Sequence, residues 1–197
     1  MKKATRIKTA AAAMKMSKSL RFLTASAMIA AMYVALSAVS YAFGLCSGAV
    51  QCRISEALCV LPVFTAAAIP GLTLGCLITN ILFGLGPVDV GLGTLATLIA
   101  AVVCRVIRKL PYLASIPTVL SNAFIVPIVL IYYKFSSGYF VDAGLVAIGE
   151  IIACGVFGTL LVWYLKTHPK TAKKIFSSPD PAAETEEVKK KAEKLKA

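Results

Sequence analysis

The sequence predicts an all-α integral membrane protein with six transmembrane helices and both termini in the cytoplasm. The chain of 197 residues is 58% hydrophobic, whereas soluble domains are about 45–50% apolar. Charged residues make up only 15% of it, against about 25% in soluble domains. Of the 21 Lys and Arg, seven lie in residues 1–21 and nine in residues 166–197. An apolar middle between two basic ends is the distribution that the positive-inside rule produces.

Six apolar runs supply the predicted spans. A helix needs about 20 apolar residues to cross the hydrocarbon core, and residues 22–43 meet this length without a charge. The runs at 57–69 and 71–83 are shorter and are separated by Ile69-Pro70-Gly71, a strong turn signal. These two runs therefore form either two spans or a re-entrant hairpin. The remaining spans are expected at 90–104, 112–133 and 143–165.

The basic residues also predict the orientation of these spans, because cytoplasmic loops are enriched in Lys and Arg. The N-terminal segment is then cytoplasmic, and the connections at 44–52, 84–89 and 134–142 lie outside. Ser40-Tyr41-Ala42 loosely resembles a cleavage site. The apolar run before it is longer than the apolar region of a signal peptide, so we interpret it as an uncleaved first helix.

The composition divides the chain into three parts. Residues 1–21 form a basic cytoplasmic segment, and residues 22–166 form the six-helix membrane domain. Residues 167–197 are rich in Pro, Lys and Glu, and we expect a charged cytoplasmic tail that is disordered or partly helical.

The placement of the charges and the motifs of the sequence argue against several classes of function. The net charge of +12 does not indicate nucleic-acid binding, because the cations flank apolar segments and do not line a folded face. There is no phosphate-binding G-x-x-x-x-G-K-[ST] motif and no Ser/His/Asp or HExxH arrangement. We therefore expect neither an enzyme nor a bound cofactor.

Cysteine and histidine do not predict a metal site. The six cysteines form no CxxC pair, and His168 is the single histidine. Cys46 and Cys52 both fall in the first outer loop, so a disulfide between them is open but not implied.

Acidic residues of the membrane domain are the strongest candidates for function. Apart from the two ends, they are Glu56, Asp89, Asp142 and Glu150, and all four map to the outward half of the predicted topology. Glu150 lies roughly 12 Å into the sixth span at about 1.5 Å per residue. A charge at such depth is a functional candidate that faces the bundle interior or a water-filled cavity. The alternative is a structural ion pair with Arg53, and the two can coexist.

Two amides extend this set, and Asp89 within it has two possible roles. Asn80 fits a hydrogen bond between helices, whereas Asn122, five residues before the helix-opening Pro127, fits a ligand contact equally well. Asp89 follows Gly86-Pro87, so it either caps a helix or binds a ligand. Gly91, Gly93, Thr94 and Thr97 form a small-residue face suited to close packing.

A stripe of small residues runs along the first span. Ala27, Ala31 and Ala35 recur at i, i+4 and i+8, which places them on one face of a helix. Small residues allow another helix to approach closely. The stripe therefore serves either packing within the same bundle or docking of another membrane protein.

Three stretches of the chain form a recognisable series. They are Arg53-Ile54-Ser55-Glu56-Ala57-Leu58 followed by Leu61-Pro62; Ala68-Ile69-Pro70-Gly71 leading into Gly75-Cys76 and Asn80; and Gly86-Pro87-Val88-Asp89 leading into Gly93-Thr94-Leu95-Ala96-Thr97. In this order they resemble the signature of the QueT family, the substrate-binding S-components of energy-coupling factor (ECF) transporters assigned to queuosine precursors. The resemblance covers about residues 22–165, and the extended basic N-terminus lies outside it.

The resemblance implies a six-helix S-component bundle in a bacterial cell membrane, with a ligand pocket near the outer face. It implies that Ala27, Ala31 and Ala35 dock on a transmembrane coupling subunit, and that two ATPase subunits supply the energy. The bundle is then expected to topple in the membrane and to carry its pocket inward. The implied substrate is a 7-deazaguanine such as queuine, preQ1 or preQ0. The expected substrate-binding residues are Arg53, Glu56, Asp89, Asn122 and Glu150.

The chemistry of that substrate suits these residues. A 7-deazaguanine presents two adjacent N–H donors, which a carboxylate of Glu150 or Glu56 can accept, and a carbonyl oxygen, to which Asn122 or Arg53 can donate. A second carboxylate can pair with the aminomethyl cation of preQ1. Four aromatics are expected either to stack on the base or to lie in the membrane interface, namely Tyr41, Phe43, Tyr139 and Phe140.

Two other functions remain open. The same architecture can bind another small nutrient, because a fold does not fix a substrate. An independent secondary transporter can instead use Glu150 and Asp89 as proton sites, although we find no internal repeat of the kind that such carriers often contain.

Overall fold

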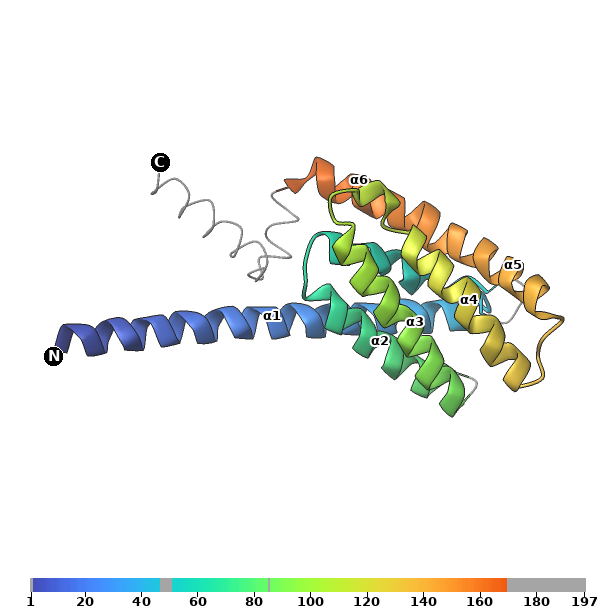
Figure 1. Cartoon of the computed structure of the whole chain (residues 1–197), viewed down its shortest axis with the longest axis horizontal. Coiled ribbons are helices and arrows are strands. Elements are labelled where there is room, and N and C mark those ends of the chain that lie inside the picture. Colours follow the sequence, from blue (N-terminus) through green and yellow to red (C-terminus); the bar gives the residue numbers. More distant parts are fainter. Residues whose placement is uncertain (1, 47–50, 85, 170–197) are drawn as a thin grey trace.

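The computed structural model describes residues 2–46, 51–84 and 86–169, with side chains from Ser19 onward. These residues form helices and no strand (Figure 1), which agrees with the predicted helical membrane bundle. The predicted tail beyond residue 169 lies outside the described residues. The elements are α1 (Lys2–Ala42), η1 (Ile54–Val63), α2 (Ala68–Phe83), α3 (Pro87–Val106), η2 (Pro111–Leu113), α4 (Ile116–Tyr132), α5 (Tyr139–Glu150), η3 (Ile151–Gly158) and α6 (Thr159–Thr167).

Four segments of the described chain are long and apolar enough to cross a membrane. They are Ser19–Ala42, Pro87–Val106, Pro111–Tyr132 and Tyr139–Thr167. The last segment joins α5, η3 and α6 without a break. The two short predicted spans correspond to η1, with 10 residues, and α2, with 16 residues. The count of six membrane crossings therefore stays a prediction.

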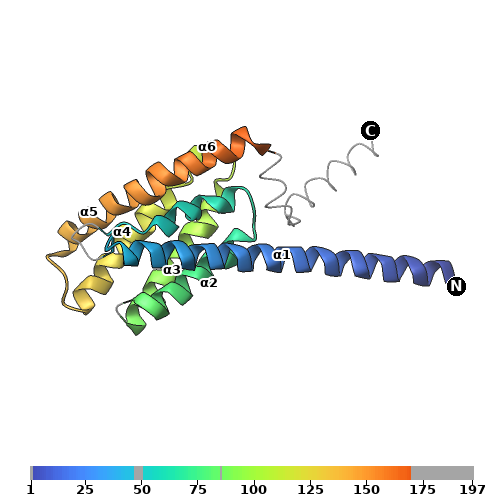
Figure 2. The same cartoon turned by 180° about the vertical axis from the view of Figure 1, so that it is seen from behind.

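The chain runs back and forth between two ends of the bundle. The N-terminal half of α1 and the end of α6 lie at one end. The junctions of α2 with α3 and of α4 with α5 lie at the opposite end, as does the C-terminal end of α1 (Figures 1 and 2). This arrangement fits an even number of crossings, and the side of the membrane on which each end lies stays a prediction.

The short helix η1 lies in the core of the bundle. Residues 55–62 are buried, and η1 packs against η3, α1 and α3. It is a 3₁₀ helix of 10 residues, longer than the three or four that such helices commonly have. Backbone of this kind is tolerated at membrane depth where it is buried in protein. Its last carbonyls, those of Pro62 and Val63, accept hydrogen bonds from Arg105 Nη1 at 3.0 and 3.3 Å.

The predicted turn at Ile69-Pro70-Gly71 is wrong in position. The connection lies at 64–67, and α2 begins at Ala68, so Pro70 falls in the first helical turn, where a missing N–H is tolerated. Gly71 instead allows close packing: a Cβ there would lie 2.7 Å from the backbone oxygen of Ser26 on α1. One turn later, a Cβ at Gly75 would lie 2.8 Å from Cβ of Tyr33.

The last segment of the bundle contains a π-helical stretch. It occupies η3, directly after Glu150, and π-helical turns inside α-helices occur frequently at functional sites. Gly158, at the end of this stretch, lies against η1, because a Cβ there would be 2.9 Å from Val60 Cγ1. The close approach fixes the position of η3 next to η1.

Candidate functional site

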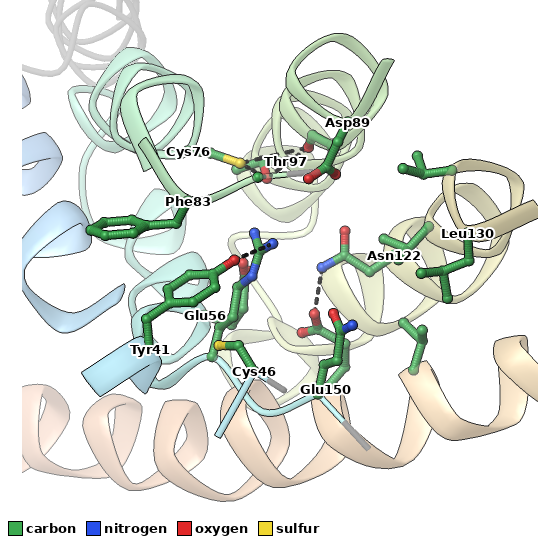
Figure 3. A pocket seen from close by; sticks show the side chains of 17 residues that line it. Tyr41, Cys46, Glu56, Cys76, Phe83, Asp89, Thr97, Asn122, Leu130 and Glu150 are labelled. Atoms are coloured by element: carbon green, nitrogen blue, oxygen red, sulfur yellow. Dashed lines mark hydrogen bonds between the residues drawn. The ribbon is translucent and has the colours of Figure 1, made fainter. Parts of the chain in front are cut away.

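A pocket lies among α1, α2, α3, α4 and α5, next to the C-terminal end of α1 (Figure 3). It has about 770 Å3 of empty space, including the part open to solvent. Its lining combines charged, polar, aromatic and aliphatic side chains: Tyr41, Cys46, Gln51, Arg53, Glu56, Cys76, Phe83, Gly84, Asp89, Gly93, Thr97, Asn122, Val126, Val129, Leu130, Val146 and Glu150.

All five residues predicted to bind the substrate line this one pocket. They are Arg53, Glu56, Asp89, Asn122 and Glu150, and they come from different segments of the chain. The four acids and amides are between 2% and 9% exposed, and Arg53 is half-buried. The fold therefore brings together polar side chains that are up to 97 positions apart, from 53 to 150.

Glu150 keeps one carboxylate oxygen available. Asn122 Nδ2 on α4 donates a hydrogen bond to Glu150 Oε1 at 2.6 Å (Figure 3). Oε2 of the same carboxylate is buried and has no hydrogen-bond partner among the described residues. A buried acceptor without a partner is unfavourable by about 1–3 kcal/mol. The arrangement is suited to a ligand that brings a donor into the pocket.

Glu56 differs from Glu150, because protein groups already use both of its oxygens. The hydroxyl of Tyr33 donates to Oε1, and the thiol of Cys59 donates to Oε2 at 3.0 Å. Sequence reasoning left either glutamate as the group that reads the base. Of the two glutamates, Glu150 is the one with a carboxylate oxygen that has no partner among the described residues.

Arg53 is held by neutral side chains. Its Nη1 donates to Asn80 Oδ1 at 2.9 Å, and its Nη2 donates to the hydroxyl of Tyr41 at 3.1 Å. No hydrogen bond joins it to Glu150, whose described partner is Asn122, so the predicted Arg53–Glu150 pair is not formed through a hydrogen bond. Guanidinium has five N–H donors, which leaves others for a ligand.

Asn80 links three parts of the site, as expected of an amide between helices. In addition to accepting from Arg53, its Nδ2 donates to the backbone oxygen of Asp89 at 3.4 Å and to Cys76 Sγ at 3.4 Å. It thus ties α2 to the first turn of α3.

Asp89 is the third residue of α3, and the helix is capped by Gly86 without a side-chain hydrogen bond. Asp89 is therefore not the N-cap residue of α3. A carboxylate in the first turn interacts favourably with the helix dipole. Gly84 leaves room for it, because a Cβ there would lie 2.7 Å from Asp89 Oδ2. The Asp89 side chain points into the pocket (Figure 3).

Gly86 gives the turn before α3 its shape. Its φ of 147° favours glycine, and a Cβ would lie 2.5 Å from the hydroxyl of Tyr133. That hydroxyl also accepts a hydrogen bond from the Val88 backbone N–H at 3.2 Å. The close contact with α4 fixes where Asp89 enters the pocket.

Of the four predicted aromatics, Tyr41 alone lines the pocket. Its ring stacks on Phe83, with centroids 4.9 Å apart and planes 21° apart, and sequence reasoning missed Phe83. Phe83 lies at the outer end of the apolar run 71–83, and this position was the signal that could have identified it. Phe43 and Phe140 are 77% and 88% exposed, and Tyr139 donates to the backbone oxygen of Phe124 at 3.1 Å.

A polar wall on α2 and α3 was also missed. Thr97 Oγ1 donates to Cys76 Sγ at 3.1 Å, and both residues line the pocket with Gly93. Gly93 and Thr97 had been interpreted as a packing face only. Their spacing of four and eight residues from Asp89 places all three on one helix face, and that spacing could have identified them.

The two cysteines of the first outer connection are both free thiols. Cys46 lines the pocket, and the Cys52 backbone N–H donates to the oxygen of Leu45 at 2.9 Å. Burial raises the pKa of both thiols above its usual value, so they are protonated at neutral pH. Among the residues with a described position, no cluster of His, Cys, Asp or Glu could hold a metal ion.

The alanine stripe of α1 faces away from the bundle. Ala27, Ala31 and Ala35 are exposed, whereas Tyr33 on the inner face is fully buried. The alternative that the stripe packs within the same bundle is therefore wrong. Large apolar side chains flank it on the exposed surface, with Leu23 60%, Met28 46% and Met32 46% exposed.

Comparison with known proteins gives one finding that covers most of the chain. The family model described as QueT transporter matches residues 23–167. No curated protein and no solved structure matches.

Proposed function

The chain belongs to the QueT transporter family, and from this premise we propose that it is the substrate-binding S-component of an ECF-type importer for a queuosine precursor. A member of a transporter family with several apolar helices is a multi-pass membrane protein and not an enzyme. We propose the bacterial cell membrane as its location. The pocket is the basis for the proposed substrate, and the exposed face of α1 is the basis for the proposed partner subunits.

The observation that carries this proposal is the Glu150–Asn122 pair. Glu150 Oε2 is buried, lines the pocket and accepts no hydrogen bond from the described protein groups. A 7-deazaguanine presents an N1–H and an exocyclic amine side by side, and a carboxylate can accept both. The hydrogen bond from Asn122 holds the carboxylate in one orientation, which lowers the entropy lost on binding.

The other walls of the pocket can complete the recognition of a planar, polar base. Arg53 has further N–H groups that can donate to the carbonyl oxygen of the base. The stacked rings of Tyr41 and Phe83 offer an aromatic surface at the pocket wall. Asp89, on α3, lines the pocket with a carboxylate that can pair with a protonated amine such as that of preQ1.

The exposed stripe of α1 supports docking to the transmembrane coupling subunit. Ala27, Ala31 and Ala35 lie on the outside of the bundle, where a partner helix can approach closely because small side chains leave the backbone accessible. We propose that two ATPase subunits bound to this coupling subunit drive the import.

Calorimetric titration of the purified protein in detergent tests the proposed substrate. The ligands are queuine, preQ1, preQ0 and guanine, and we expect one 7-deazaguanine to bind much more tightly than guanine. A correctly folded sample that binds none of the four would overturn the substrate assignment. Uptake in cells tests the mechanism: we expect import to require the coupling subunit and its ATPases. Import driven by a proton gradient without them would instead indicate an independent carrier.

A further inference from the structure

The inner face of α1 is hydrogen-bonded to four consecutive residues at the start of η1, which runs alongside it (Figure 2). The pairs run in opposite directions along the two segments. They are Tyr41 OH with Arg53 Nη2 at 3.1 Å, Ser40 Oγ with Ile54 N at 2.9 Å, Ser37 Oγ with Ser55 Oγ at 2.8 Å, and Tyr33 OH with Glu56 Oε1. The residues of α1 are spaced so that they share one helix face.

Two of the four partners on this segment line the pocket, whereas three of the four α1 residues that hold the segment do not. Arg53 and Glu56 are lining residues, whereas Tyr33, Ser37 and Ser40 are absent from the lining. All three hydroxyl residues are 0% exposed. Buried hydrogen bonds of this kind cannot be replaced by water without cost, so they fix the position of the segment.

The backbone of residues 53–56 needs hydrogen-bond partners from outside η1, because it lies at the start of this helix. The first backbone N–H groups of a helix have no partner within the helix, and Arg53, the residue before η1, makes no side-chain capping bond. Ser40 Oγ accepts from the Ile54 N–H and so satisfies one of these donors from a different helix. This bond ties the backbone, and not only a side chain, to α1.

We propose that Tyr33, Ser37 and Ser40 are positioning residues that set substrate affinity by holding residues 53–56 against the pocket. The proposal rests on the proposed function, namely that this pocket binds the substrate. The three residues do not line the pocket themselves. They act on Glu56 directly, through Tyr33, and on Arg53 through its chain neighbour Ile54.

Ser26 provides a matched control on the same helix. Its Oγ donates to the backbone oxygen of Ala67 at 3.0 Å, and the residue is 5% exposed. Ser26→Ala therefore deletes a buried hydrogen bond between α1 and the interior, as Ser37→Ala and Ser40→Ala do, but away from residues 53–56.

The test combines hydrogen–deuterium exchange without ligand and titration with preQ1 and queuine, both on the full-length protein in detergent. Loss of one buried hydrogen bond changes an equilibrium constant, for local opening or for binding, by about tenfold. We expect Ser40→Ala to speed exchange at the Ile54 amide by about that factor. We expect Ser37→Ala and Tyr33→Phe to weaken ligand affinity by about five- to tenfold, and Ser26→Ala to leave both readouts within about twofold of wild type.

A double-mutant cycle adds a readout that a general loss of stability would not give. If Ser37 acts through Ser55, the variant with both serines changed to alanine should bind no more weakly than either single variant. The proposal is overturned if Ser37→Ala and Ser40→Ala leave exchange and affinity unchanged, or if Ser26→Ala weakens binding equally. Wild-type protein that binds no 7-deazaguanine would defeat the proposed function, while exchange at Ile54 would still decide whether α1 holds the segment.

Discussion

Asn122 donates a hydrogen bond to Glu150 across the space between α4 and the end of α5, at 2.6 Å. The two residues are 28 positions apart in the sequence, and each stands in an apolar helix. Because the amide engages one carboxylate oxygen, the other is left buried and without a described partner at the pocket wall. The pair thus combines a fixed orientation with an unused acceptor.

Removal of this acceptor should weaken substrate binding strongly. Glu150→Gln preserves the size of the side chain but replaces one oxygen by a donor, which meets the donors of the base unfavourably. Hydrogen bonds to charged groups are worth about 1.5–3 kcal/mol, so we expect ligand affinity to fall by about 10- to 100-fold in a calorimetric titration. Asp142→Asn is the control, because Asp142 is buried and its carboxylate accepts hydrogen bonds, among the described residues, from Ser136 and Ser137 of the adjacent connection. Equal affinity of Glu150→Gln and wild type would remove Glu150 from the recognition of the base.

The balance of charge in the pocket should favour a cationic ligand. Three lining residues are acids, Glu56, Asp89 and Glu150, and Arg53 is the single lining residue with a cationic side chain. We therefore expect preQ1, which carries an aminomethyl cation, to bind more tightly than preQ0, which carries a neutral nitrile. Asp89→Asn should reduce the preference for preQ1 by about tenfold, the size of one charge-assisted hydrogen bond. A preference that persists in this variant would assign the cation to another carboxylate.

The close contact of α1 with α2 should depend on glycine. In Gly75→Val the side chain would meet Tyr33, since a Cβ at this position already lies 2.8 Å from Cβ of Tyr33. Overpacking of this kind typically reduces stability by about 1–3 kcal/mol, so we expect a lower melting temperature. Gly91→Val is the matched control in α3, where a Cβ meets nothing within 4 Å. Similar melting temperatures for the two variants would contradict the packing described for Gly75.

The alanine stripe should be required for assembly but not for ligand binding. Ala31→Trp fills the exposed face of α1, so we expect co-purification with the coupling subunit to be lost while preQ1 affinity stays within about twofold, as for substitutions outside a site. Leu120→Trp introduces the same side chain at a residue of α4 that is 51% exposed. We expect that control to keep the complex. Survival of the complex in Ala31→Trp would show that docking occurs elsewhere.

The polar part of the site was predictable because ionisable groups stand out in an apolar chain. Arg53, Glu56, Asp89, Asn122 and Glu150 were found in this way, and the structure brings all five to one pocket. The choice between the two glutamates was not predictable. It depends on partners from distant segments, Tyr33 for one and Asn122 for the other.

Neutral features of the fold escaped prediction for a related reason. Phe83, Cys76 and Thr97 line the pocket, but their residue types do not stand out in an apolar chain, so that only their positions, such as the spacing of Thr97 from Asp89, could have identified them. The 3₁₀ geometry of η1 could not be anticipated either, because its run of apolar residues lacks a clear period. The proline at position 70 is typical of a connecting turn, but it is equally suited to the first turn of a helix. Only the packing of α2 decides which of the two structures forms.

The burial of η1 has a consequence for biosynthesis. At about 2.0 Å per residue, its 10 residues extend about 20 Å, less than the hydrocarbon core of about 30 Å. In the finished fold it is enclosed by α1, α3 and η3, so lipid is not the environment that keeps it in place. It reaches its final surroundings only after the helices that enclose it have left the ribosome. The pocket is therefore completed late, once Glu150 and the π-helical stretch behind it have been synthesised.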